Sequence, residues 1–265
     1  MRRNVTARIN LTVTEPAELV FAVAVSSEYA PTTETLTVTV NGEPVEVAEL
    51  LDQHGTRLHN VKVATGDLVL EYQASIDGEV EPPPYDRADL IRYLRPSRYA
   101  ESDALAPTAG AEFRGIAGAA ELLASVSSWV GTRLMYVAGS SLPTDGAIRT
   151  LLGRQGVCRD YAHLTVALLR ALNVPARLVA VYAPGLNPMD FHAVAEAFVD
   201  GAWHVVDSTT LAPRSTLVRI ATGRDAADTA FLTVISGRIE LGPIIVTAVA
   251  DELPADDVTQ LAHIA

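Results

Sequence analysis

The sequence predicts an α+β protein in which an N-terminal antiparallel β-sandwich, residues 1–84, precedes a unit with helices first and a sheet after, residues 85–265. Two observations carry this prediction. Apolar and polar residues alternate with a period of two through residues 5–77, which is typical of strands with one buried face. Beyond residue 112 the apolar spacing changes to three and four residues, and it returns to two after Pro175. Helices followed by an antiparallel sheet are typical of the α+β class.

The strands of the first unit are predicted from alternation and turn residues. Residues 5–13 place apolar side chains at every odd position and polar ones between them. Residues 36–40 alternate again and run into Asn41-Gly42, a dipeptide that favours a hairpin because both turn positions take positive φ. Residues 61–63 and 68–73 add further strands, so an antiparallel sandwich is the simplest arrangement.

The second unit is predicted to begin after a proline-rich segment. Glu81-Pro82-Pro83-Pro84 forms a domain boundary or a rigid strap, because prolines stiffen the chain and supply no N–H group. Residues 85–112 show no clear period, and we expect an irregular linker there. Helices are predicted at residues 116–130, 147–152 and 158–172. Strands are predicted at residues 177–182, 192–199, 202–206, 231–235 and 244–249.

The composition is that of a globular protein, with 49% hydrophobic and 20% charged residues. A formal net charge of -12 repels nucleic acid and anionic membranes, so we expect neither as a partner. No apolar stretch approaches the ~20 residues that span a bilayer. Glu15, Pro16 and Glu18 stand directly before the apolar residues 19–25, which argues against a signal peptide. We therefore expect a cytoplasmic protein.

Cys158 is the only cysteine, so the chain forms no internal disulfide and no thiolate metal cluster, and we expect no metal or other cofactor. It stands at the start of the clearest predicted helix, where unpaired N–H groups and the helix dipole favour negative charge. A thiolate there is a nucleophile, and the same N–H groups stabilise an oxyanion. Taken alone, however, a lone cysteine is more often a small buried core residue.

His192 and Asp207 are predicted to meet across a hairpin. Asp200-Gly201 is a strong two-residue turn signal and fixes the register of the two flanking strands. In that register Val194 lies opposite Asp207, and His192 is a diagonal neighbour of Asp207 on the same face. Diagonal neighbours are roughly 7–8 Å apart at the backbone, a gap that a His–Asp hydrogen bond bridges. Such a carboxylate orients the imidazole and stabilises its charged form. Taken singly, each residue is explained more simply as a satisfied histidine or a turn carboxylate.

Two runs carry a family resemblance: Gly156-Val157-Cys158-Arg159-Asp160-Tyr161-Ala162-His163, and residues 169–177, Leu-Arg-Ala-Leu-Asn-Val-Pro-Ala-Arg. They resemble the core of bacterial transglutaminase-like proteins, a papain-related group that includes proteins assigned as cysteine proteases. His192-Ala193 and residues 203–209 resemble the His and Asp motifs of that family, in the same order. The resemblance is specific over roughly residues 130–235. Further similar segments are residues 223–228 and, more loosely, residues 93–99 and the strand-rich N-terminal half.

The resemblance implies a papain-like, transglutaminase-like core with Cys158 as the nucleophile, His192 as the general base and acid, and Asp207 as the orienting carboxylate. Tyr136 occupies a position that resembles a family tyrosine, which implies either an oxyanion donor in the cleft or a packed side chain. Two positions depart from the family pattern: Val194 replaces a common Trp and Ser208 replaces a common Pro. Both are expected to alter the substrate cleft more than the triad, because neither residue type is needed for attack or proton transfer. They weaken the transfer of substrate specificity from the family.

The predicted activity is acyl transfer through a Cys thioester. Water as the acceptor gives a protease or amidase, which we favour, and an amine gives a transglutaminase. The expected substrate is a protein, a peptide or a small amide. Two alternatives lie outside this chemistry: a non-catalytic binding module that keeps the fold, and a structural adaptor led by the N-terminal sandwich. The presence of all three triad residues argues against the binding module.

Overall fold

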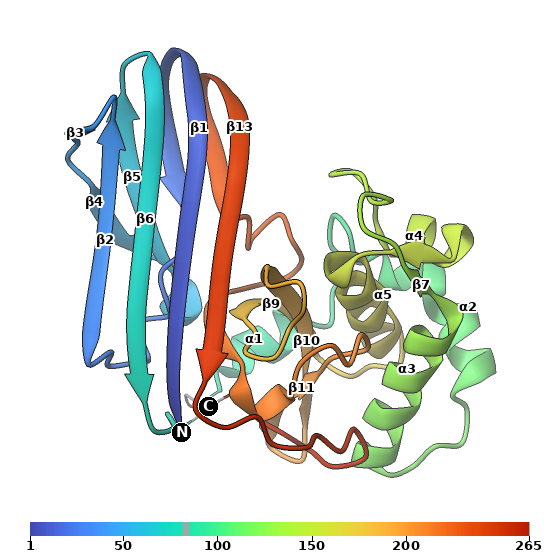
Figure 1. Ribbon diagram of the computed structural model, residues 1–265. Helices are drawn as coiled ribbons and strands as arrows, with labels where there is room; N and C mark the ends of the chain where they lie inside the picture. Colours follow the sequence, from blue (N-terminus) through green and yellow to red (C-terminus); the bar gives the residue numbers. More distant parts are fainter. Residues whose placement is uncertain (82–84, 265) are drawn as a thin grey trace.

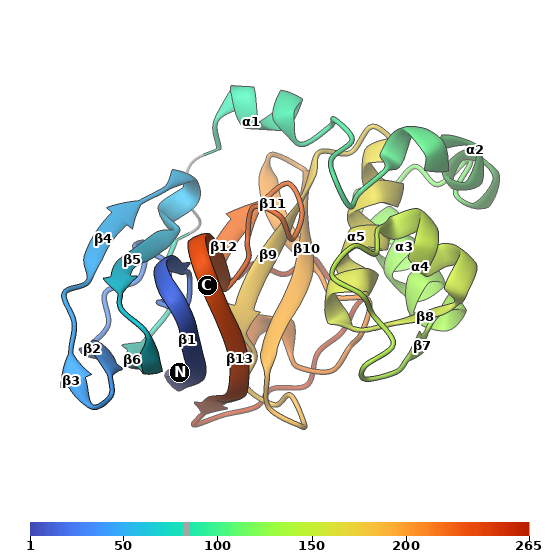
Figure 2. The same cartoon turned by 90° about the horizontal axis from the view of Figure 1, so that it is seen from above.

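The computed structural model, which describes residues 1–81 and 85–264, has two antiparallel sheets and one group of helices (Figure 1). Seen from above, the smaller sheet lies between the larger sheet and the helices (Figure 2). This arrangement confirms the predicted α+β class. The boundary or strap expected at Pro82-Pro83-Pro84 lies outside the described residues.

The larger sheet contains strands from both halves of the chain. Its order is β3-β2-β6-β1-β5-β4, and β13 pairs antiparallel with β1. Asn41 and Gly42 have φ of 51° and 83° and form the predicted hairpin turn between β2 and β3. The short helix η1 (Gln53–Gly55) joins β4 to β5. The strands are β1 (Arg2–Phe21), β2 (Thr33–Val40), β3 (Glu43–Pro44), β4 (Ala48–Leu51), β5 (Arg57–Val63), β6 (Gly66–Asp77) and β13 (Leu232–Ala250).

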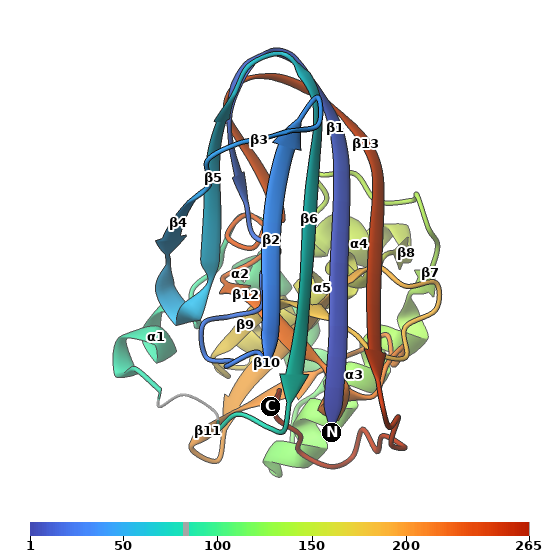
Figure 3. The same ribbon diagram turned by 60° about the vertical axis from the view of Figure 1, so that its left-hand side comes forward.

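β1 and β13 are long enough to belong to both layers of the predicted sandwich. Residues 2–13 of β1 pair with β6, whereas residues 17–21 pair with β5. Between these two stretches the register of β1 with β13 shifts, and both strands turn over at the far end of the sheet (Figure 3). The two halves of one folded sheet therefore face each other and enclose an apolar core.

Gly237 lets the two long strands approach each other closely where they turn over. Its φ is +85°, a conformation that side chains disfavour. A Cβ built at this position would lie 2.3 Å from the carbonyl oxygen of Pro16, where no atom fits. Both the backbone conformation and the available space therefore require glycine.

The smaller sheet has the order β11-β10-β9-β12, with every pair antiparallel. Ala195 lies opposite Val206 and Val199 opposite Ala202, which is the register predicted from Asp200-Gly201. The short helix η2 (Arg214–Thr216) precedes β12. The strands are β9 (Ala176–Tyr182), β10 (Phe191–Val199), β11 (Ala202–Val206) and β12 (Val218–Gly223).

Helix α5 is the central helix: it packs on β9 and β10, and α2, α3 and α4 each contact it. Two short strands, β7 (Met135–Tyr136) and β8 (Gln155–Gly156), pair in parallel just before α5. Among the described residues, no helix has the length and apolarity needed to cross a membrane. The helices are α1 (Arg87–Arg92), α2 (Ser102–Glu112), α3 (Ala119–Arg133), α4 (Ala147–Gly153) and α5 (Cys158–Ala171).

One face of the smaller sheet is covered by two different neighbours. On this face, the residue pairs that follow one another along β9 and β10 are Ala176 with Ala197, Leu178 with Ala195, Ala180 with Ala193 and Tyr182 with Phe191. The first pair packs in the apolar cluster of α5, and the last packs against the core of the larger sheet. The helix and the larger sheet therefore meet over the middle of this ladder.

Two expectations about the division of the chain were wrong. Residues 85–112 are not irregular, because they contain α1 and α2. Asp86 caps α1 by accepting the Ala88 N–H at 2.9 Å, and α2 contains Pro107, a helix breaker that packing against α5 outweighs. Residues 231–235 and 244–249 do not extend the smaller sheet. They lie in or next to β13, because the partner of this strand is β1 at the other end of the sequence.

The contrast between two glycines of the larger sheet yields a prediction. Gly42 has φ of +83° with nothing within 4 Å of a built Cβ, whereas Gly237 combines a positive φ with a clash. We expect Gly42→Ala to lower the free energy of unfolding by about 1 kcal/mol, through backbone strain alone. Gly237→Ala should cost at least about 3 kcal/mol, because overpacking adds to the strain. Urea unfolding of both variants measures the difference, and equal losses would contradict the close approach.

Candidate active site

Cys158 is the first residue of α5, and a carboxylate on the same helix fixes the backbone before it. Asp160 Oδ2 accepts the Val157 N–H at 2.8 Å, and Asp160 Oδ1 accepts the Ser141 hydroxyl at 2.9 Å. A Cβ on Gly156 would lie 2.6 Å from the Asp160 Cβ, so glycine is needed for the carboxylate to fold back. This corner holds the partly exposed Cys158 thiol at the positive end of the helix.

His192 and Asp207 lie side by side, as the register predicts. Nε2 of His192 donates to Asp207 Oδ2 at 2.9 Å, and the two residues are only 2% and 3% exposed. Burial alone lowers the pKa of His192, but the Asp207 carboxylate and the Cys158 thiol together raise it to about 10. Because Nε2 faces Asp207, Nδ1 is the ring nitrogen left for the thiol.

Thr209 holds the other oxygen of Asp207, a contact that sequence reasoning missed. Its N–H and its hydroxyl both donate to Asp207 Oδ1, at 2.8 and 2.7 Å. Burial raises the pKa of Asp207, but His192 and Thr209 hold it below its usual range. The signal was present in the sequence, since a carboxylate that accepts the N–H two residues later forms a common local turn.

The two residues that depart from the family pattern both make contacts within the protein framework. Val194 is buried in an apolar cluster with Val179 and Val205. The Ser208 hydroxyl shares a 2.7 Å hydrogen bond with Thr165 of α5, which ties the Asp207 segment to the helix. Both residues therefore support the framework around the reactive groups.

Tyr136 lies beside Cys158, because β7 and β8 pair Tyr136 with Gly156. Burial raises the pKa of Tyr136 to about 12. The Cys158 thiol adds to this rise, whereas the Cys158 backbone N–H, which faces the phenol oxygen, opposes it. The side chain is 43% exposed and lines a cavity of about 570 Å³ together with Thr209. The hydroxyl thus lies next to the N–H expected to stabilise an oxyanion.

A separate cavity of about 250 Å³ opens at Cys158 and His192. It lies where α5 and the larger sheet meet over the smaller sheet, so all three contribute to its walls. Most of its surface is apolar, which suits an uncharged group next to the thiol. Its other lining residues are Ala22, Arg159, Leu178, Ala180, Phe191, Ala193, Ile220, Ala226, Thr229, Ala230, Phe231 and Leu232.

A buried ion cluster fixes the strand that carries His192. Glu196 is 1% exposed and accepts from Arg177 at 2.7 Å and from Arg219 at 2.8 Å. Burial raises the pKa of Glu196, but the two guanidinium groups lower it to about 2. Arg219 also donates to Glu28 at 2.7 Å, so this cluster joins the smaller sheet to the segment that follows β1.

Comparison with known proteins assigns the fold to a family. A model of the transglutaminase-like superfamily matches residues 108–208, which include Cys158, His192 and Asp207. A Cytophaga hutchinsonii protein, crystallised under the name "Putative Cysteine Protease", is 34% identical, with a TM-score of 0.87 over 96% of this chain and 92% of that one. The chain belongs to the transglutaminase-like superfamily.

Two curated relatives of this transglutaminase-like chain come from mycobacteria. An uncharacterized protein of Mycobacterium leprae is 26% identical over 165 residues, which are 58% of this chain and 57% of that protein. An uncharacterized protein of Mycobacterium tuberculosis H37Rv is 39% identical over 62 residues, which are 23% of this chain and 20% of that one. The matches therefore span about half of the M. leprae relative and a fifth of the M. tuberculosis one.

The His192–Asp207 pair predicts how stability depends on pH. The folded-state pKa of His192 is about 10, above its unfolded value of roughly 6.5, so its contribution is complete below pH 6.5 and is lost as pH rises towards 10. Asp207 has a lowered pKa, so its contribution disappears only in acid. We expect Asp207→Asn to cost about 3 kcal/mol at pH 6 and much less at pH 10.

This comparison is best made in a Cys158→Ala background, where no thiol titrates. Urea unfolding of the parent and of Asp207→Asn at intervals between pH 5 and pH 10 gives the difference directly. A difference that stays constant over this range would show that the imidazole does not carry the charge in the folded protein.

Proposed function

We propose that the chain is a thiol-dependent acyl-transfer enzyme that hydrolyses a peptide or carboxamide bond through a thioester on Cys158. The observation that carries the proposal is the 2.9 Å hydrogen bond from His192 to Asp207, next to the cavity that His192 shares with Cys158. A helix N-terminus, an imidazole and a buried carboxylate together form the arrangement that activates a thiol.

In the proposed reaction the Cys158 sulfur attacks the carbonyl carbon and forms the C–S bond. The oxyanion accepts the Cys158 backbone N–H, and His192 then protonates the departing amine as the C–N bond breaks. Water enters, gives a proton to His192 and attacks the thioester, which releases the acid and the thiolate. Asp207 remains ionised and keeps Nε2 occupied, so Nδ1 does the proton transfer.

Tyr136 is proposed as the second oxyanion donor. Its hydroxyl lies beside the Cys158 N–H, and its raised pKa keeps it protonated at neutral pH, so it is able to donate. The partner we propose is a protein, a peptide or a small amide. A cytoplasmic location is proposed because a chain with one cysteine, and so no internal disulfide, fits a reducing compartment.

Alkylation of Cys158 by iodoacetamide between pH 4 and pH 9 tests the activated thiolate. We expect fast labelling already near pH 6, because the imidazolium of His192 stabilises the thiolate. His192→Ala should slow labelling at pH 6 at least tenfold, while Val194→Ala serves as a matched control on the same strand. If the alkylation rate instead rises with a midpoint near pH 8.5, as for an ordinary thiol, the enzymatic proposal is contradicted.

Tyr136→Phe separates oxyanion stabilisation from thiolate activation. Alkylation by iodoacetamide develops no oxyanion, so its rate should stay unchanged in this variant. Acylation by p-nitrophenyl acetate does develop one, and its rate should fall by about tenfold to hundredfold. Stopped-flow release of p-nitrophenolate measures the second rate. Equal effects on both reactions would assign Tyr136 a packing role.

A further inference from the structure

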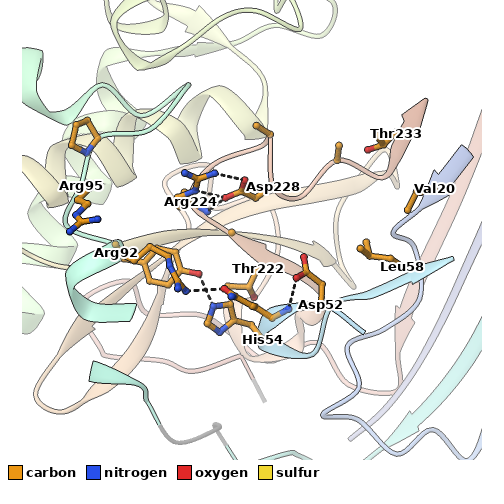
Figure 4. Close-up of a pocket in the computed structure, with 16 residues that line it drawn as sticks. Val20, Asp52, His54, Leu58, Arg92, Arg95, Thr222, Arg224, Asp228 and Thr233 are labelled. Carbon is orange, nitrogen blue, oxygen red and sulfur yellow. Dashed lines mark hydrogen bonds and ion pairs between the residues drawn. The ribbon is translucent and has the colours of Figure 1, made fainter. Parts of the chain in front are cut away.

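Another cavity, of about 750 Å³, is shown in Figure 4 and shares a lining residue with the cavity at Cys158. Residues 226–233 form the wall between them. Ala226, Thr229, Phe231 and Leu232 line the Cys158 cavity, whereas Ala227, Asp228 and Thr233 line the larger one, and Ala230 lines both. The two cavities therefore meet at Ala230.

Two segments that resemble the transglutaminase-like family have no role in the proposed chemistry, and the larger cavity brings them together. Residues 93–99 and 223–228 both contribute to its walls. Arg170 of α5 holds both: its guanidinium donates to the Arg95 carbonyl at 3.0 Å and to the Arg224 carbonyl at 2.6 Å. Buried His163 accepts the Ala226 N–H at 3.1 Å, and burial lowers its pKa to about 3. The backbone of both segments is thus anchored to the helix that carries Cys158.

The lining of this cavity is locally positive in an acidic chain. Three arginines, Arg92, Arg95 and Arg224, line it against two aspartates, Asp52 and Asp228, whereas the formal net charge of the chain is -12. His54 also lines it, but burial lowers the pKa of this imidazole, which leaves it neutral at pH 7. The lining of the cavity is therefore less acidic than the chain as a whole.

Several guanidinium donors in the cavity remain available. Asp228 occupies Nε and Nη2 of Arg224, at 2.8 and 2.9 Å, and leaves Nη1. Nη1 of Arg92 donates to the side-chain oxygen of Gln53 at 2.8 Å, and the same nitrogen forms an ion pair with Asp89. The exposed Arg95 side chain forms no hydrogen bond or ion pair with the described residues, although its carbonyl is fixed by Arg170. The backbone of Arg95 is anchored, and its guanidinium group is unoccupied by the residues that the structure describes. Such a group is suited to bind a carboxylate through two parallel hydrogen bonds.

We propose that this cavity is a substrate subsite in which Arg95, supported by Arg92 and Arg224, binds a carboxylate of the peptide whose carbonyl Cys158 attacks. The inference rests on the proposed function. The apolar cavity at Cys158 takes the reacting residue, and the carboxylate lies a few residues away along the peptide. It belongs either to an acidic side chain or to the end of the peptide.

Chloroacetyl peptides with the electrophile at either end test the subsite, because Cys158 displaces chloride and forms a thioether. Each series carries Asp one, two or three residues from the electrophile, and Asn probes serve as neutral partners. A third set ends in a free carboxylate and distinguishes the chain end from a side chain. We expect at least one Asp or free-carboxylate probe to label Cys158 tenfold or more faster than its neutral partner, with the advantage shrinking as salt rises.

Arg95→Ala should abolish this advantage, because the free guanidinium is lost while the anchored backbone stays. The matched control is Arg98→Ala, which removes an exposed arginine of the same segment that does not line the cavity. Both variants should keep the parent iodoacetamide rate. Normal iodoacetamide labelling without a preference for carboxylate probes would overturn the subsite but would leave the proposed enzymatic function standing. An ordinary thiol profile with iodoacetamide would overturn the proposed function, and the subsite would fall with it.

Discussion

The arrangement of the layers and the cavity at Cys158 both depend on how one face of the smaller sheet is covered. An apolar sheet face must be shielded from water, and here α5 covers one end of the β9–β10 ladder while the larger sheet covers the other. Two bodies that meet over a flat ladder leave a gap at their junction. Cys158 lies on the helix side of that gap, and Phe231 and Leu232 lie on the side of the larger sheet. The cavity is thus a consequence of packing two different layers on one surface.

Each residue of the proposed triad at this junction has its own anchor. Asp160 shapes the turn before Cys158, Asp207 orients His192, and Thr209 orients Asp207. None of these anchors depends on a bound substrate, so the geometry is set before binding. For the proposed reaction, a site set in advance in this way avoids the free-energy cost of reorganising dipoles. The ion cluster of Glu196, Arg177 and Arg219 also makes β10, the strand that carries His192, more rigid.

Local signals predicted much of this arrangement from the sequence. The turn at Asp200-Gly201 fixed a register in which His192 and Asp207 meet, because a two-residue hairpin leaves the pairing no freedom. The place of β13 was not predictable in the same way, because its partner lies at the other end of the sequence and no local pattern specifies it. The α2 helix was missed because Pro107 opposes the helical pattern and only packing against α5 compensates.

The pairing of β1 with β13 also determines the order in which the protein assembles. Residues 2–21 leave the ribosome long before residues 232–250, so β1 waits for its full partner while every helix and the smaller sheet are synthesised. Contacts between such distant residues form late and slowly. The edge of β1 that pairs with β13 stays open to chaperones, and to wrong partners, throughout this interval. The last strand to be made closes the larger sheet and completes the wall opposite Cys158, so the nascent chain acquires its cavity only when translation has passed β13.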